Sequence, residues 1–155
     1  MHATVLVSLL TLLYVLTVTP AAAECAGKEN STDLPAGYVL LGAWGVGAEH
    51  GVSLACERND SRWTFFLQRN VGGATHLKWL TRVTLVIPKP PKGFTLASNC
   101  FLAGQKDPEV IAIVRETRRP RFVSIQRAWR VDTEKELFVE IPMKGIVCVN
   151  PASDQ

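Results

Sequence analysis

The stretch that most constrains the fold runs from Cys100 to Cys148, with a cysteine at each end. Four strand-like runs fill this stretch, at 109–115, 122–131, 137–141 and 145–149. The second and third runs alternate apolar and polar residues, which is typical of strands with one buried face. The first run is apolar at 110–114, as expected of a strand buried on both faces. Short connections between the runs favour an antiparallel meander.

The alternation in the second run predicts one continuous strand over 122–131, with Val123, Ile125 and Trp129 among the residues on its apolar face. Arg127 falls on the same face. Three arrangements would accommodate its charge there: burial with a partner, stacking on Trp129, or a β-bulge that resets the register.

Further strands are expected earlier in the chain, at 37–41, 51–57, 63–68, 82–87, 94–97 and 100–102. Residues 75–79 are ambiguous between a strand and a short helix start, and the glycines of 42–47 predict a bend beside Trp44. Three prolines in 88–93 must take the chain out of the sheet. About eight short strands predict an all-β fold, an antiparallel sandwich or a small barrel.

The first 23 residues have the pattern of a secretory signal peptide. Residues 3–19 contain no Lys, Arg, Asp or Glu, and Pro20 is followed by three alanines that suit a cleavage site. We therefore expect a signal peptide at 1–23, a single disulfide-bonded β domain at 24–155, and a secreted or periplasmic protein without a stable membrane span after cleavage. The alternative is an uncleaved membrane anchor, for which this segment is at the lower length limit.

All four cysteines lie in the part expected to be exported, which implies two disulfides in an oxidising compartment. Four cysteines allow three connectivities, and the sequence does not decide among them. We favour Cys25–Cys56 with Cys100–Cys148. Free buried thiols are the alternative, whereas zinc is disfavoured because zinc ligand pairs usually lie about two to four residues apart.

The arginines near the C-terminal half of the chain form the best candidate binding site. Six of them lie between positions 115 and 130, against one acidic residue, and Trp129 accompanies them: Arg115, Arg118, Arg119, Arg121, Arg127 and Arg130. Guanidinium groups bind carboxylate and phosphate bidentately. The cluster predicts an anionic partner: a polysaccharide, a lipid head group or an acidic protein surface.

A simpler alternative is that these arginines pair with acidic residues on neighbouring strands, since four acids follow within 132–140. Nucleic acid is disfavoured as a partner, because the chain is expected to be exported and aromatic residues are not interleaved with the basic ones.

Signals for catalysis are sparse. The alternative to a binding protein is a secreted hydrolase that uses Glu49 and His50 or an unrecognised carboxylate pair. Adjacent residues on a strand point to opposite faces, however, and the sequence has no G-x-S-x-G elbow. We predict no catalytic residue, no metal and no cofactor.

Among the tryptophans, Trp63 and Trp129 fit a core, while Trp44 and Trp79 suit a core or a ligand cleft equally. Two asparagines, Asn30 and Asn59, begin N-glycosylation sequons, which matter only in a host that glycosylates secreted proteins.

The last fifty or so residues carry a resemblance. The sequence at 107–114, followed by 128–132, Phe138 and 147–150, resembles the C-terminal part of small exported bacterial proteins of unassigned function. The resemblance implies a periplasmic or secreted protein and no particular activity, since none of these segments is specific to a chemistry.

Overall fold

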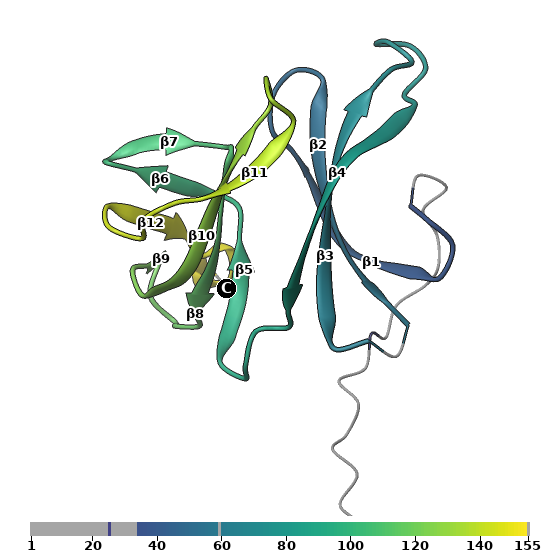
Figure 1. Ribbon diagram of the computed structural model, residues 1–155. Coiled ribbons are helices and arrows are strands. Elements are labelled where there is room, and N and C mark those ends of the chain that lie inside the picture. Colours follow the sequence, from purple (N-terminus) through teal and green to yellow (C-terminus); the bar gives the residue numbers. More distant parts are fainter. Residues whose placement is uncertain (1–24, 26–33, 59, 155) are drawn as a thin grey trace, which may run out of the picture.

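The computed structural model describes Cys25 and residues 34–58 and 60–154, and it is all-β (Figure 1). Twelve strands form three antiparallel sheets of four strands each, followed by one 3-10 turn at Pro151–Asp154. The all-β prediction is confirmed. The described part of the chain has more strands than the eight or so expected, because short segments such as Gln105–Asp107 also pair.

The first sheet is an antiparallel meander. Its strands lie in chain order: β1 (Tyr38–Gly45), β2 (His50–Glu57), β3 (Arg62–Asn70) and β4 (Trp79–Pro88). The glycines near Trp44 do not end β1, which continues to Gly45 after a register shift between Leu40 and Gly42. The ambiguous segment at 75–79 is neither a strand nor a helix before β4 begins at Trp79.

The second sheet contains three of the four runs between Cys100 and Cys148. Its order is β11-β10-β8-β5, with β5 (Phe94–Ala97), β8 (Val110–Arg115), β10 (Ile125–Asp132) and β11 (Leu137–Glu140). The third sheet has the order β7-β6-β12-β9, with β6 (Cys100–Leu102), β7 (Gln105–Asp107), β9 (Arg121–Phe122) and β12 (Ile146–Val149). The fourth run, β12, therefore leaves the expected meander.

The prediction of one strand over 122–131 is wrong. The segment divides at Val123 and Ser124, because β9 pairs with β12 in the third sheet while β10 pairs with β8 in the second. The Ser124 carbonyl accepts a hydrogen bond from the Arg115 amide at 2.9 Å. Val123 is consequently 64% exposed instead of lying on the apolar face.

The second sheet lies between the other two and packs against both (Figure 1). On β8, Ile111 and Ile113 join the core shared with the first sheet. Val110, Ala112 and Val114 join a second core shared with the third sheet. Strand β8 is apolar on both faces because each face fills a different core.

The main core confirms the placement of two tryptophans. Trp129 is buried between the sheets near Phe65, and Trp63 is partly buried and packs against the same cluster. Burial of side chains this large contributes strongly to stability, since each removes a wide apolar area from water.

Both disulfides join the pairs that we favoured, Cys25 with Cys56 and Cys100 with Cys148, and no cysteine is free. Cys100 and Cys148 are directly opposite on β6 and β12. Their positions are 48 residues apart, for which the chain-entropy model gives about 4 kcal/mol of stabilisation.

Three predictions concern residues outside the described part of the chain: the signal peptide at 1–23 and the sequons at Asn30 and Asn59. Within the described residues, no helix has the length and apolar character needed to cross a membrane.

Candidate functional site

The segment from Arg115 to Arg121, here called the arginine loop, connects β8 to β9 and is anchored from the C-terminal end of β12. Asn150 is 4% exposed, and its side-chain amide donates hydrogen bonds to the carbonyls of Thr117 (2.7 Å) and Arg119 (2.9 Å). The Asn150 backbone amide donates to the Pro120 carbonyl at 2.9 Å. Asn150 therefore holds the loop at three carbonyls of its apex, two through its buried side chain and one through its backbone amide.

The loop also contains a local hydrogen bond, from the Arg119 amide to the Thr117 hydroxyl oxygen at 3.2 Å. Such a contact between a threonine side chain and the backbone two residues on is a common turn-forming interaction. Proline at position 120 further restricts the backbone. These features fix the backbone from which the arginine side chains project.

The arginines of the loop are exposed, and within the described residues none of them forms an ion pair. They are Arg115, Arg118, Arg119 and Arg121. Glu116 is the one acidic residue of the loop, and it is exposed as well. The arginine loop thus presents a concentrated positive charge with its hydrogen-bond donors available.

The other predicted binding residues, Arg127, Trp129 and Arg130, are in a different environment. Arg127 lies over the Trp129 ring, with 4.7 Å between its guanidinium carbon and the ring centroid, and pairs with Glu140 at 2.8 Å. A β-bulge also shifts the register between Ile125 and Arg127. Stacking and a bulge, two of the three predicted arrangements, thus occur together. The Arg127 hydrogen bonds lower the pKa of the Glu140 carboxyl.

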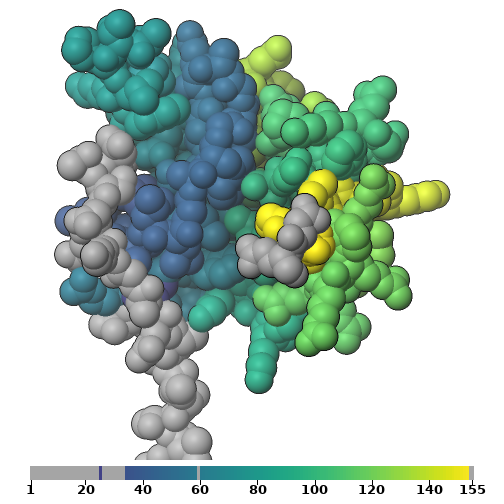
Figure 2. Space-filling view, turned by 180° about the vertical axis from the view of Figure 1, so that it is seen from behind, coloured from purple at the N-terminus to yellow at the C-terminus, as the bar shows by residue number. Residues whose placement is uncertain are grey.

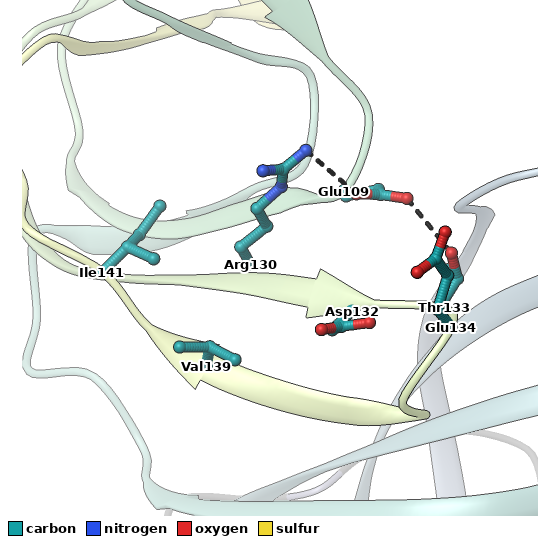
Figure 3. Close-up of a pocket in the computed structure, with 7 residues that line it drawn as sticks. All are labelled: Glu109, Arg130, Asp132, Thr133, Glu134, Val139 and Ile141. Carbon is teal, nitrogen blue, oxygen red and sulfur yellow. Dashed lines mark hydrogen bonds and ion pairs between the residues drawn. The ribbon is translucent and has the colours of Figure 1, made fainter.

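Arg130 contributes to a small pocket of about 350 Å³ beside β10 and β11 (Figure 3). Its guanidinium lies 3.3 Å from a Glu109 oxygen and 3.4 Å from an Asp107 oxygen. The Thr133 hydroxyl donates to Glu109 at 3.3 Å. The pocket is also lined by Asp132 and Glu134, so its charged residues are three acids and one arginine.

The acidic pocket does not form a metal centre. In the described part of the chain, no group of three or more His, Cys, Asp or Glu side chains could hold a metal ion. Asp132 accepts a hydrogen bond from the Lys135 amide at 2.8 Å, which lowers the pKa of its carboxyl. Its charge is therefore used to stabilise the turn that follows β10.

The candidate pair Glu49 and His50 does not converge. Glu49 contacts Arg69 at 3.2 Å, whereas the His50 Nε2 atom lies 3.5 Å from a carboxylate oxygen of Glu136. The other Glu136 oxygen accepts a hydrogen bond from Arg82 at 2.5 Å. Arg82 is the main reason that the pKa of the Glu136 carboxyl is lowered, with a smaller effect from His50.

Glu136 comes from the turn between β10 and β11, where its φ of 52° is left-handed. The contacts with His50, Arg69 and Arg82 therefore connect the second sheet to three strands of the first. Sequence reasoning missed this cluster, because no local pattern relates position 136 to position 50. The one signal in the sequence was a charged residue in the predicted turn at 132–136.

Trp44 and Trp79 line a pocket of about 400 Å³ on the first sheet. Trp79 lies against Gly51, where an added Cβ would be 3.4 Å from the indole ring. The buried polar pair beneath it, Ser53 and Gln68, is satisfied by a 2.7 Å hydrogen bond from the serine hydroxyl. Trp44 also packs against the main core, so its side chain contributes both to the core and to the lining of this pocket.

Comparison with models of known protein families, with characterised proteins and with solved structures finds no significant match. The resemblance of the C-terminal residues to small exported bacterial proteins is therefore still a prediction. The case for a function rests on the geometry and charge of the sites above.

Proposed function

We propose that this is an exported binding protein that holds an anionic partner on the arginine loop. The observation that carries the proposal is the set of four exposed arginines that have no ion-pair partner among the described residues, on a loop anchored by buried Asn150. Guanidinium groups in this situation can donate bidentate hydrogen bonds to carboxylate, phosphate or sulfate oxygens.

Five of the other arginines in the described part of the chain have acidic partners within reach. Pairs join Arg62 to Asp60, Arg69 to Glu49, Arg82 to Glu136 and Arg127 to Glu140, and Arg130 contacts Asp107 and Glu109. Like charges on one loop repel each other, and a bound anion would offset that repulsion. The fixed backbone of the arginine loop also lowers the entropy cost of binding.

Export is part of the proposal. Two disulfides persist in oxidising compartments and are rare in the cytosol of most organisms. The uncharged apolar residues at 3–19 fit a signal peptide that directs the chain there. A secreted or periplasmic protein would meet anionic glycans, lipid head groups and acidic protein surfaces.

The test is a charge-loss variant, Arg118→Gln/Arg119→Gln/Arg121→Gln, with Lys78→Gln/Lys106→Gln/Lys144→Gln as a control. The control removes the same charge from exposed lysines outside the arginine loop. Binding is measured by calorimetry with heparin, with vesicles containing an anionic phospholipid, and with polyglutamate, over a series of salt concentrations.

We expect the wild-type protein to bind at least one of these polyanions with an affinity that falls as salt rises. The arginine variant should lose at least about tenfold, since hydrogen bonds to charged groups contribute roughly 1.5–3 kcal/mol each. The lysine control should stay close to wild type. Equal losses in the two variants, or no binding by the wild type, would contradict the proposal.

A further inference from the structure

A groove lies beside the arginine loop where the chain crosses from the first sheet to the second. We call it the proline groove; it has a volume of about 650 Å³ and is lined by Ser61, Trp63, residues 88–94 and Glu116. Its wall is held by hydrogen bonds from the Lys89 amide to the Ser61 carbonyl at 2.9 Å and from the Phe94 amide to the Pro91 carbonyl at 3.1 Å. The three prolines stiffen the wall further.

The proline groove and the arginine loop are continuous. Phe94 pairs with Arg115 across β5 and β8, and the Glu116 amide donates to the Gly93 carbonyl at 2.9 Å. The β4–β5 connection and the end of β8 lie at the same lower end of the molecule in Figure 1. In Figure 2 the teal segment near residue 90 and the green segment near residue 120 both reach the lower edge of the molecule.

Taken together, the two features combine positive charge with aromatic rings. Lys89 and Lys92 are exposed, and within the described residues neither forms an ion pair. They extend the positive surface of the arginine loop along the groove wall. Trp63 and Phe94 are partly buried in the groove, where their rings also pack against the main core.

We infer that the partner of the arginine loop is an anionic polysaccharide, whose chain lies across the loop and the proline groove together. This inference rests on the proposed function. Sulfate or carboxylate groups bind the arginines, the lysines add charge attraction along the chain, and the apolar face of a sugar ring packs on Trp63.

The shape of the surface favours a polysaccharide over a lipid bilayer, and the binding test below compares it with an acidic polypeptide. The rings of Trp63 and Phe94 are recessed between two sheets, so a flat bilayer would meet the loop but not the rings. A flexible, hydrated chain can enter the groove and follow the positive surface from one sheet to the other. Its many charges also make binding strongly dependent on salt.

The test uses heparin fragments of increasing length and a Lys89→Gln/Lys92→Gln variant, with Lys78→Gln/Lys144→Gln as the control that removes equal charge elsewhere. For the wild type, affinity should rise with fragment length until a fragment spans both features. The Lys89/Lys92 variant should bind long fragments about three- to tenfold more weakly, while its affinity for the shortest fragments stays near that of the wild type. The control should bind long fragments as the wild type does.

Outcomes separate this inference from the proposed function. If the Lys89/Lys92 variant binds long fragments as well as the control does, while the arginine-loop variant still loses binding, the polysaccharide path through the groove is wrong and the arginine site stands. Tighter binding of anionic vesicles or polyglutamate than of heparin would also overturn the inference. If the arginine-loop variant binds heparin normally but loses binding to vesicles or polyglutamate, only the polysaccharide inference fails. If it binds all three polyanions as the wild type does, both proposals fail.

Discussion

Arginines on the arginine loop and on strand β10 are close in sequence but have different surroundings. On β10, Arg127 pairs with Glu140 of the neighbouring strand β11, and Arg130 pairs with Asp107 and Glu109 at the end of β7 and in the turn after it, at 2.8–3.4 Å. On the loop, Arg118 and Arg119 have no such neighbour among the described residues, because the loop projects beyond the strands. The acidic neighbours of Arg127 and Arg130 neutralise their charge, whereas the charge of the loop arginines is available to bind a partner molecule.

Arg127 shows how neighbours in a sheet can occupy the hydrogen-bonding groups of an arginine. Its guanidinium stacks on Trp129 and forms two hydrogen bonds with Glu140, at 3.1 and 2.8 Å. These hydrogen bonds raise the pKa of Arg127 and lower that of Glu140. An anionic ligand would have to compete with a carboxylate already in place, whereas at Arg118 it would displace only water and counterions.

We expect the largest effect on stability and polyanion binding from removing the Asn150 side chain, which anchors the arginine loop. In Asn150→Ala the carbonyls of Thr117 and Arg119 lose their buried donor, which should lower the free energy of unfolding by about 1–3 kcal/mol. The net charge is unchanged, so any loss of polyanion binding reflects the loosened loop. We expect a loss of about three- to tenfold, because the loop must then be ordered on binding.

Urea denaturation and heparin titration measure the two effects, and the exposed Asn99→Ala variant serves as the control. If Asn150→Ala is destabilised but binds heparin as wild type does, the fixed geometry of the loop is irrelevant to binding and charge alone is sufficient.

Several features of the fold could be predicted because they depend on local patterns. The apolar residues on both faces of β8 reflect its place between two cores. Strand alternation placed Arg127 on the Trp129 face, where stacking was one of three predicted arrangements. The division at Val123 could not be predicted, because the apolar pattern continues through it while the pairing partner changes from β12 to β8.

The supports of the candidate site depend on contacts between distant parts of the chain. Asn150 anchors residues more than thirty positions earlier, and nothing around it in the sequence marks it for that role. The proline groove was predicted only as a loop outside the sheet. Its ring-lined shape requires Trp63 and Phe94 from two different sheets to meet.

An intermediate effect is expected at Glu136, where a single carboxylate contacts His50, Arg69 and Arg82. In Glu136→Gln, Arg82 would lose its acidic partner and resemble the arginines of the arginine loop, whereas Arg69 would keep its contact with Glu49. The pKa of Glu136 is lowered in the folded protein, chiefly by Arg82. Glu136 therefore stabilises the fold above its unfolded-state pKa, near 4.5, and this contribution is lost as the pH falls through the lower folded-state pKa.

We expect Glu136→Gln to unfold at a lower temperature than wild type near neutral pH, with the difference shrinking as the pH is lowered from about 5 to 3. Thermal unfolding followed by circular dichroism across this range measures the change. Glu134→Gln, at an exposed position in the same turn, is the control. A difference that stays constant at every pH would show that the charge of Glu136 does not link the two sheets.

We expect the smallest effect from Glu140→Gln. This variant directly tests the difference between the paired arginine of β10 and the arginines of the loop. This change frees Arg127 from its carboxylate while leaving its stacking on Trp129 possible. Because surface pairs of this kind contribute little to stability, the fold should tolerate the change. The affinity for heparin should rise by no more than about twofold, since one free arginine on a strand lacks the neighbours that the arginine loop provides. A rise as large as the loss in the arginine-loop variant would mean that any unpaired arginine serves equally well, and that the loop has no special role.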